Sequence, residues 1–424
     1  MKKILFNKGK ILILILMVFG FQTVYGQNTD VSYFTIKGKI KDQANKKEIV
    51  FATISIVGTH VGTVTNTDGE FTIKIKKAAN AKELEFSHIG YNSKRVLISG
   101  LKPEGNDILL ESSSVSLDEV TIRPSNAAEL VRNALALVRK NYSVIPLNFT
   151  GFYRETIKQR RDYISISEAI VDIYKGSYSK EYDYDKAKIY KGRKSANVKR
   201  TDTLAVRLQG GPYISLLLDI IKNPDVLMAY DIVSNYDYEL TNIISVSNKL
   251  NYVVSFKPRV VNDDFPLYTG KYYIDVKSLA FTSAEFSLDI NDKEKASKFF
   301  VRKKPLGLKL IPMSTNYIIK YKEVNGRYYF NYARSEVKFK CKWKKKLFNT
   351  NYTIMSEMAT TDWTAENVNK FTKKESLKKN TVFAEELTAF MDDDFWGEYN
   401  YIEPDESIET AIEKYNRRVK KQNN

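Results

Sequence analysis

The chain has 424 residues, with 67 Lys and Arg against 50 Asp and Glu, 43% hydrophobic residues, one Cys and two His. Its length and apolar fraction leave room for two or three folded domains and exclude a disordered or collagen-like chain. One cysteine cannot form an intramolecular disulfide, and two histidines cannot supply a histidine-rich metal site, so we expect no cofactor and no metal.

Residues 1–26 have the three-part pattern of a secretory signal peptide, with a lysine-rich start, the apolar run 11–19 and an end at Gly26. We expect cleavage after Gly26. The apolar run is shorter than the ~20 residues of a membrane span, so no transmembrane span is expected after cleavage. No cysteine follows the cut. We therefore expect an exported protein of the periplasm or outer membrane that is not a lipoprotein.

Strand and turn signals fill residues 34–122, and we predict a small β-sandwich there. Apolar and polar residues alternate in short runs at 34–40, 52–57, 63–65, 71–75, 84–86, 95–98 and 107–110. Asp68-Gly69 lies between two of these runs and predicts a hairpin, because Gly accepts the positive φ of such a turn. A last strand and linker are expected at 116–122.

This region resembles a known domain family. The likeness is carried by Gly38-Lys-Ile-Lys-Asp42, by Phe-Ala-Thr-Ile-Ser-Ile-Val-Gly-Thr at 51–59, by the Asp-Gly-containing stretch 62–71, and by Phe-Ser-His-Ile-Gly-Tyr at 86–91. In this order they are similar to the carboxypeptidase regulatory-like domain. The resemblance implies a transthyretin-like sandwich, common in exported proteins of the Bacteroidetes.

The family name does not imply a peptidase. A zinc carboxypeptidase needs a His-x-x-Glu pair and a later His to hold its metal. Here His60 is followed by Val-Gly-Thr and His88 by Ile-Gly-Tyr. We expect both histidines to be ordinary strand or loop residues.

Residues 123–148 are predicted to form a linker and an amphipathic helix. From 126 to 142 the apolar residues, including Leu130, Val131 and Ala134, lie on one stripe, and Ser125 is the predicted N-cap.

Residues 149–360 are predicted to form an antiparallel β-rich domain. Strands are expected at 150–157, 163–174, 252–256, 272–276, 279–290, 316–322, 327–344 and 351–355. Asn325-Gly326 predicts a hairpin turn, and a helix at 213–221 is expected to pack inside the sheet.

The hairpin at 270–281 resembles part of the half-barrel of periplasmic lipoprotein carriers, in which a curved sheet wraps helices around an apolar groove. The predicted fold class is therefore mainly β: a transthyretin-like sandwich followed by a larger, half-barrel-like antiparallel sheet with a few packed helices. Residues 361–424 are predicted to form a helical tail, with one helix through 383–391 and another beginning near Pro404.

The sequence contains no common catalytic motif. The nucleophile elbow, the phosphate-binding loop and the dinucleotide turn are all absent from the sequence. Acidic clusters at 182–185, 263–264, 289–292 and 392–394 offer oxygen ligands for Ca²⁺ but lack the spacing of an EF-hand loop. Whether they bind Ca²⁺ stays open, and we name no catalytic residue.

Residues 337–344 have a row of basic side chains with a defined geometry. Period two places Val337, Phe339, Cys341 and Trp343 on one strand face, and Lys338, Lys340, Lys342 and Lys344 on the other. Such a row is either a solvated face that prevents edge pairing or a docking surface for anionic lipid headgroups or acidic glycan. Nucleic acid is not an expected partner, because no recognition motif is present.

Two functional hypotheses remain. The favoured one is an exported, non-enzymatic binding or scaffold protein of the cell envelope, whose β-rich domain holds an apolar ligand, a glycan or an envelope partner. The alternative is a hydrolase of envelope polymers, using carboxylates that only the fold brings together.

Overall fold

The computed structural model describes residues 33–113, 126–180, 182–196, 210–224, 233–259, 267–290, 296–297, 307–344, 349–389, 395–406, 408–410 and 412–413. The predicted signal peptide, the predicted strand at 116–122 and the acidic clusters at 263–264 and 392–394 lie outside these residues, as does part of the cluster at 289–292.

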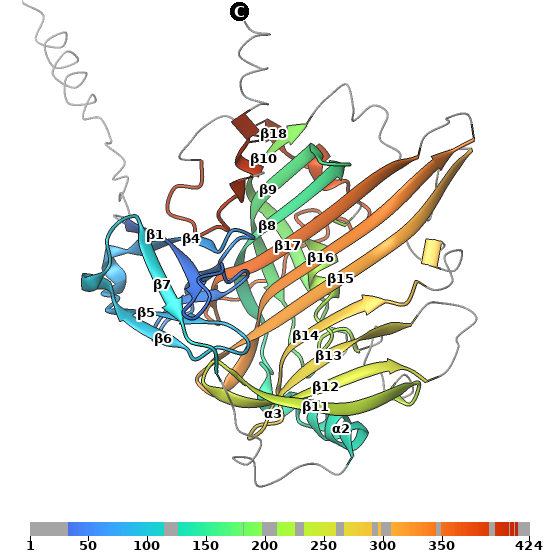
Figure 1. The fold of residues 1–424 in the computed structure, drawn as a ribbon. Coiled ribbons are helices and arrows are strands. Elements are labelled where there is room, and N and C mark those ends of the chain that lie inside the picture. Colours follow the sequence, from blue (N-terminus) through green and yellow to red (C-terminus); the bar gives the residue numbers. More distant parts are fainter. Residues whose placement is uncertain are drawn as a thin grey trace, which may run out of the picture.

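The N-terminal part is a β-sandwich of two antiparallel or mixed sheets (Figure 1). Its strands are β1 (Tyr33–Asp42), β2 (Thr53–Ile56), β3 (Gly62–Val64), β4 (Glu70–Lys76), β5 (Glu83–Ser87), β6 (Lys94–Leu97) and β7 (Asn106–Leu110), with 3-10 helices η1 (Lys77–Ala79) and η2 (Ile98–Gly100). One sheet has the order β4-β1-β7 and the other β3-β2-β5-β6. Ile40, Ile54, Phe71 and Phe86 are fully buried between them.

The hairpin predicted at Asp68-Gly69 is wrong. β3 pairs with β2 and β4 pairs with β1, so the turn crosses from one sheet to the other. The Asn66 side chain accepts hydrogen bonds from the backbone N–H groups of Asp68 and Glu70. Gly69 has a φ of 70°, which explains the Asp-Gly signal without a hairpin.

The second part is a large curved sheet. Its long strands are β8 (Leu147–Gln159), β9 (Asp162–Lys175), β10 (Lys186–Ala196), β11 (Tyr236–Val246), β12 (Lys249–Pro258), β13 (Tyr268–Asp275), β14 (Phe281–Leu288), β15 (Leu308–Val324), β16 (Arg327–Trp343) and β17 (Thr350–Thr364). The order is β11-β12-β13-β14-β15-β16-β17-β8-β9-β10, with the two-residue strand β18 (Thr388–Ala389) parallel to β10 at the edge. The predicted mainly β fold class is confirmed.

The predicted Asn325-Gly326 turn is confirmed. It joins β15 to β16, and both residues have positive φ, 51° and 78°. Strands β10 and β11 were not predicted from the sequence.

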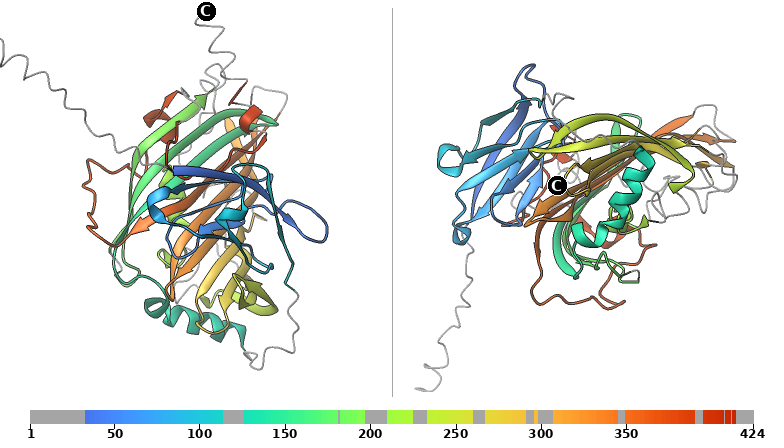
Figure 2. Two further views of the ribbon diagram at one scale, coloured as in Figure 1. Left: turned by 90° about the vertical axis from the view of Figure 1, so that its left-hand side faces the viewer. Right: turned by 90° about the horizontal axis from the view of Figure 1, so that it is seen from below.

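Among the described residues, three short α-helices accompany the sheet: α2 (Ala127–Ala136), α3 (Val138–Asn141) and α5 (Pro212–Leu217). The sheet curves around α2, while the sandwich lies on its opposite side (Figure 2). We call these the helix face and the sandwich face. Leu130, Val131 and Ala134 are buried against the helix face, as the stripe predicts. The N-cap is Asn126, whose side chain accepts from Ala128 and Glu129; Ser125 lies outside the described residues.

The helix predicted through 383–391 is not formed as a whole. The 3-10 helix η5 (Phe383–Glu386) is followed by Leu387 in extended conformation and by β18. Phe383 and Leu387 are buried in the main core, so tertiary packing and pairing with β10 replace the continuous helix. After Pro404, Asp405 accepts a backbone hydrogen bond from Glu409 and its carboxylate accepts one from the Ile408 N–H, as in a first helical turn.

Among the described residues, none of the helices has the length and hydropathy to cross a membrane.

Candidate functional site

A hollow of about 450 Å³ opens on the sandwich face, where β8 begins and β9 and β17 end. We call it the main hollow. One row of side chains crosses its floor in register: Asp362 on β17 is opposite Thr150 on β8, Thr150 is opposite Asp172 on β9, and Asp172 is opposite Lys188 on β10. The four residues line the same space although they are up to 212 positions apart in sequence.

The charges of the main hollow are largely paired. Lys188 Nζ lies 3.4 Å from the Asp172 carboxylate. Lys370 Nζ donates to Asp183 at 2.8 Å. Partial burial raises the pKa of Asp362 above its ordinary value, and its carboxylate accepts a hydrogen bond from the Trp363 N–H at 2.8 Å.

Aromatic side chains form the walls of the main hollow. Trp363 and Phe371 line it, whereas the Phe149 side chain is 2% exposed and packs in the helix-face core. The Trp363 ring stacks on His60 of the sandwich with 3.6 Å between ring centroids and on Tyr329 with 4.4 Å. His60 therefore has a structural contact that fixes one wall, as expected for an ordinary loop residue.

Residues 369–375, which follow β17, line one side of the main hollow and are held in shape by hydrogen bonds within the segment. The Glu375 carboxylate accepts from the Thr372 N–H and hydroxyl, both at 2.8 Å, and these bonds lower the pKa of Glu375. The Lys186 ammonium donates to the Phe371 carbonyl, which ties this segment to β10.

A smaller hollow of about 320 Å³ lies next to it, lined by Pro146, Tyr174, Lys180, Tyr182 and Asp183. The Lys370–Asp183 ion pair separates the two hollows. Burial alone would raise the pKa of Asp183, but hydrogen bonds from Lys370, the Ser177 N–H and Tyr174 hold it below its ordinary value.

The helix face is filled by the protein's own side chains. Tyr142 and Phe281 are fully buried there, and the Tyr142 hydroxyl donates to the Phe281 carbonyl at 2.6 Å. Tyr178 and Tyr321 both donate to the buried Asp219 carboxylate. These side chains pack together as one core on the helix face.

The buried Asp219 belongs to an ion cluster in the helix-face core. Lys175 Nζ lies 2.6 Å from Asp219 and 2.6 Å from Asp185, and all three side chains are at most 7% exposed. Asp185 comes from the acidic cluster 182–185, so its carboxylate is paired with an internal lysine. Among the described residues, no group of three or more His, Cys, Asp or Glu is placed to hold a metal ion.

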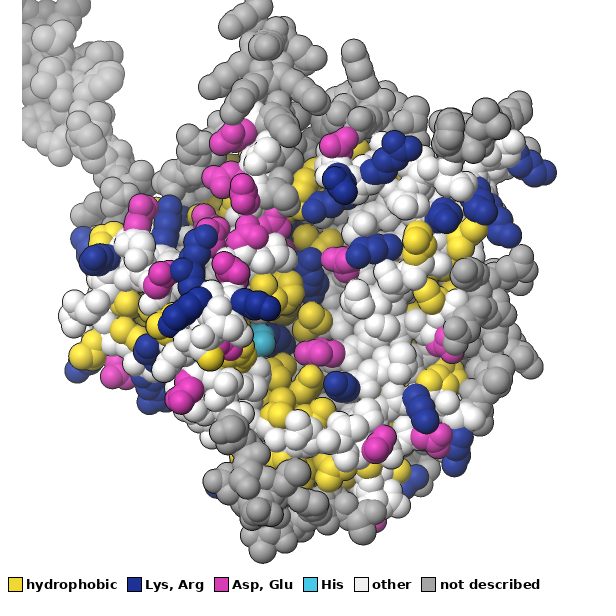
Figure 3. Space-filling view, viewed as in Figure 1, with side chains coloured by type: hydrophobic (Ala, Val, Ile, Leu, Met, Phe, Trp, Pro, Cys, Tyr) yellow, Lys and Arg dark blue, Asp and Glu magenta, His cyan; other side chains and the backbone are white. Residues whose placement is uncertain are grey.

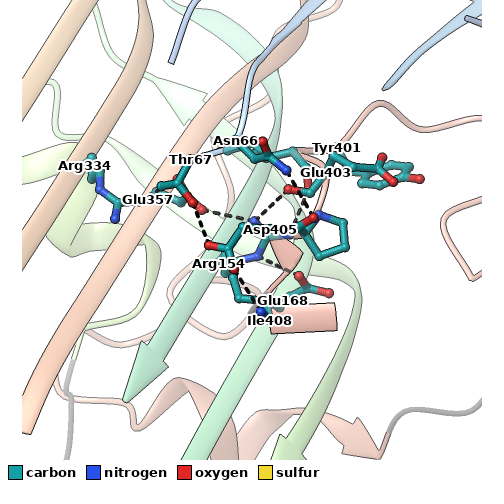
Figure 4. A network of polar contacts seen from close by, with 12 residues as sticks. Asn66, Thr67, Arg154, Glu168, Arg334, Glu357, Tyr401, Glu403, Asp405 and Ile408 are labelled. Atoms are coloured by element: carbon teal, nitrogen blue, oxygen red, sulfur yellow. Dashed lines mark hydrogen bonds and ion pairs between the residues drawn. The ribbon is translucent and has the colours of Figure 1, made fainter. Parts of the chain in front are cut away.

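Residues 395–406, which we call the strap, lie between the sandwich and the large sheet. A buried arginine network attaches the strap to the sheet (Figure 4). Arg154 on β8 is 1% exposed; it donates to Glu168 at 2.7 Å and Glu357 at 3.1 Å, and to the Ile402 carbonyl of the strap at 2.8 Å.

The strap is attached to the sandwich by separate hydrogen bonds. Lys74 and Asn400 form two hydrogen bonds. The Lys74 backbone N–H donates to the Asn400 side-chain oxygen at 2.7 Å, and the Asn400 side-chain amide donates to the Lys74 carbonyl at 3.1 Å. The Thr67 hydroxyl donates to Asp405 at 2.8 Å. Sandwich, strap and sheet therefore share one interface, which also holds His60 against the main hollow.

The predicted lysine row has the alternation expected of it. Val337, Phe339 and Cys341 are buried on the helix face, and Trp343 is half-buried. The lysines lie on the sandwich face: Lys338, Lys342 and Lys344 are exposed and Lys340 is half-buried. Lysine and arginine side chains gather toward the upper right of Figure 3, where the long strands end. Lys338 pairs with Glu336 at 3.2 Å. Docking to an anionic surface stays a prediction.

The structure brings together site residues that the sequence did not indicate. Asp172, Asp362 and Lys188 carried no motif, and only strand register places them in one row. The aromatic stretch 328–332 is mostly buried packing, with Tyr329 supporting Trp363.

Residues 36–122 match the family model described as the CarboxypepD_reg-like domain, in agreement with the resemblance of the sequence. No curated protein matches the chain.

Several solved structures are similar to this chain at low identity. A domain described as an outer membrane lipoprotein-sorting protein from Vibrio parahaemolyticus has 10% identity and a TM-score of 0.24, covering 57% of this chain and 94% of its own. A LolA superfamily protein from Nitrosomonas europaea has 12% identity and a TM-score of 0.18, with 58% and 99% covered. The Pseudomonas aeruginosa MucA/MucB complex contains a chain with 12% identity and a TM-score of 0.17, with 54% and 93% covered.

Proposed function

We propose that this protein is an exported, non-enzymatic binding protein of the cell envelope that holds a neutral glycan in the main hollow. The observation that carries the proposal is the hollow itself, where aromatic walls stand over a floor of hydroxyl, carboxylate and ammonium groups. Export rests on the signal-peptide pattern of residues 1–26.

The lining suits a sugar because a pyranose has both apolar C–H faces and many hydroxyl groups. Trp363 and Phe371 offer aromatic surface, and Thr150 and Asn369 offer groups that both donate and accept hydrogen bonds. A few convergent polar groups within an aromatic-lined hollow are the usual composition of a small-molecule site.

The charge pattern favours a neutral glycan over an acidic one. Lys188 is paired with Asp172 and Lys370 with Asp183, so both ammonium groups of the hollow already have a carboxylate partner. Asp362 and Glu375 add further negative charge. An acidic polysaccharide would have to displace one of these carboxylates.

The apolar ligand expected for a half-barrel is less well supported. Its groove would be the helix face, where Tyr142, Phe281 and their neighbours already occupy the concave side. The described part of that face is packed like a protein core.

The hydrolase alternative rests on one observation. Asp172 and Asp362 lie in register on the two strands that flank β8, which puts their Cα atoms about 10 Å apart. Two carboxylates facing one hollow are what a glycosidase needs.

Affinity gel electrophoresis tests the proposal with the mature chain, residues 27–424. The gels contain xylan, laminarin, pullulan or the acidic polymer alginate. We expect retardation by at least one neutral polymer, and about tenfold weaker binding for Phe371→Ala, which loses one aromatic wall. Leu97→Ala removes an exposed side chain of the sandwich and is the matched control.

Two results would contradict the proposal. If none of the neutral polymers slows the protein in the gel, it does not bind these glycans. If only alginate slows it, the ligand is acidic and not neutral. New reducing ends in the same polymers, lost in Asp172→Asn, would establish the hydrolase instead.

A further inference from the structure

The two hollows lie in sequence along the same face of the sheet. Asp172, in the main hollow, and Tyr174, in the smaller one, are two residues apart on β9 and point to the same side. Their strand partners follow the same order, because Thr150 is opposite Asp172 and Asn148 is opposite Tyr174. Asn148 and Thr150 both line the main hollow, so the two hollows adjoin at the row of Asn148 and Tyr174.

The partition between them is thin and polar. It consists of the Lys370–Asp183 pair, with 2.8 Å between Nζ and Oδ1. Lys370 lines the main hollow and Asp183 the smaller one, and the Lys370 ammonium also lies 5.0 Å from the centre of the Tyr174 ring. A ligand that follows the sheet from one hollow to the other would pass over hydrogen-bonding groups rather than over a hydrophobic wall.

Two tyrosines beside the smaller hollow are exposed to an unusual extent. Tyr182 is 74% exposed and Tyr184 is 57% exposed, and their ring centroids are 6.4 Å apart. Most other tyrosines of this sheet are buried or half-buried. Tyrosine is a rigid side chain that offers a large contact area at low entropic cost, so exposed pairs of this kind are suited to ligand contact.

We propose that the two hollows form one extended site for a glycan chain, in which the main hollow holds one sugar unit and the exposed Tyr182 and Tyr184 contact the units that follow. This rests on the proposed function, because it assigns the length of the ligand to the same site. The substrate class is then a polysaccharide or long oligosaccharide, and a free monosaccharide or disaccharide fills only part of the site.

The test is isothermal titration of the mature chain with xylo-oligosaccharides, laminari-oligosaccharides and malto-oligosaccharides of two, four and six units. We expect the affinity for one series to increase at least tenfold from the disaccharide to the hexasaccharide. In the double variant Tyr182→Ala/Tyr184→Ala this increase should shrink to threefold or less.

Tyr182 lines the smaller hollow and Tyr184 lies against its ring. Tyr190→Ala is the matched control, because Tyr190 is also 57% exposed but its ring lies against Tyr399 of the strap, with 5.1 Å between centroids. It should retain the full dependence on length. Far-UV circular dichroism and the thermal midpoint of each variant exclude a general loss of fold.

The possible failures are distinguishable. Binding that does not depend on length, or length dependence that survives loss of both tyrosines, overturns the extended site and leaves the proposed function standing. If none of the oligosaccharides binds, and none of the polysaccharides above retards the protein, the proposed function and the extended site fall together.

Discussion

Replacement of Arg154 by methionine tests whether the buried network holds the strap between sandwich and sheet. Methionine fills similar volume but removes the cation, and so leaves the strap carbonyl of Ile402 without its donor at 2.8 Å. Removal of one partner from a buried ion pair costs about 3–5 kcal/mol, because a charge is left desolvated.

The surroundings place the expected cost at the lower end of that range. Glu168 keeps Arg193 at 3.1 Å, and Glu357 keeps Arg334 at 3.1 Å. Neither carboxylate is therefore left without a cation. We expect Arg154→Met to lower the free energy of the first unfolding transition by about 3 kcal/mol.

Urea unfolding followed by tryptophan fluorescence measures this loss. Trp396 of the strap is 4% exposed and packs on Phe152 with 5.4 Å between ring centroids, so its emission reports separation of the strap from the sheet. Arg161→Met, at an exposed turn, is the control and should change the same free energy by less than about 0.5 kcal/mol.

The reasoning is refuted if Arg154→Met unfolds within about 1 kcal/mol of the wild type. It is also refuted if limited proteolysis cuts residues 395–406 no faster in this variant than in the wild type. Either result would mean that the network does not hold the strap in place.

Three further predictions concern other parts of the molecule. Burial raises the pKa of Glu155 to about 8, so between its ordinary pKa of about 4.3 and pH 8 the native state binds more protons than the unfolded state. The free energy of unfolding of the wild type should therefore fall as the pH rises through this interval. Urea titrations at pH 5 and pH 8 should show this fall in the wild type but not in Glu155→Gln. Gly192→Ala would place a Cβ 2.5 Å from the Leu387 side chain, so we expect a loss of about 1–3 kcal/mol in the same assay, and an unchanged midpoint would contradict this packing. Lys338→Gln/Lys342→Gln should weaken flotation with vesicles of anionic lipid severalfold at low salt, whereas equal flotation of variant and wild type would assign these lysines to a solvated face.

The sequence predicted the sandwich and most of the long strands because their pattern is local. Residues 333–343 alternate strictly, and Asn325-Gly326 is a turn that depends only on its own backbone. The pattern failed at β10, where Lys186, Lys188, Lys191 and Lys194 interrupt the apolar alternation. Those lysines reach out from an edge strand to the strap and the neighbouring segments, so polarity there reflects tertiary partners.

The candidate site could not be predicted for a different reason. Asp172 and Asp362 meet only because β17 pairs with β8, a contact between segments about 200 residues apart. At Asp68-Gly69, too, the local sequence does not determine which strands pair. Its residues predict a turn, but whether the flanking strands pair with each other is decided by β1 and β2.

The strap also sets an order of events during folding. The Thr67–Asp405 bond and the Lys74–Asn400 pair close loops of more than 320 residues. Nothing in the sandwich core involves the strap, so the sandwich can collapse as soon as its own seven strands have been synthesised and delivered. Direct contacts of the sandwich with the sheet, such as the hydrogen bond from the Lys320 ammonium to the Phe51 carbonyl, do not involve the strap, but the strap's own bonds must wait for residues 395–406. During that interval the face that will receive the strap is uncovered, including Val64 and the polar edge from Asn66 to Asp68. A chain halted before residue 395 would therefore retain a folded N-terminal unit with an unsatisfied surface, which is the form that proteases and chaperones are able to recognise.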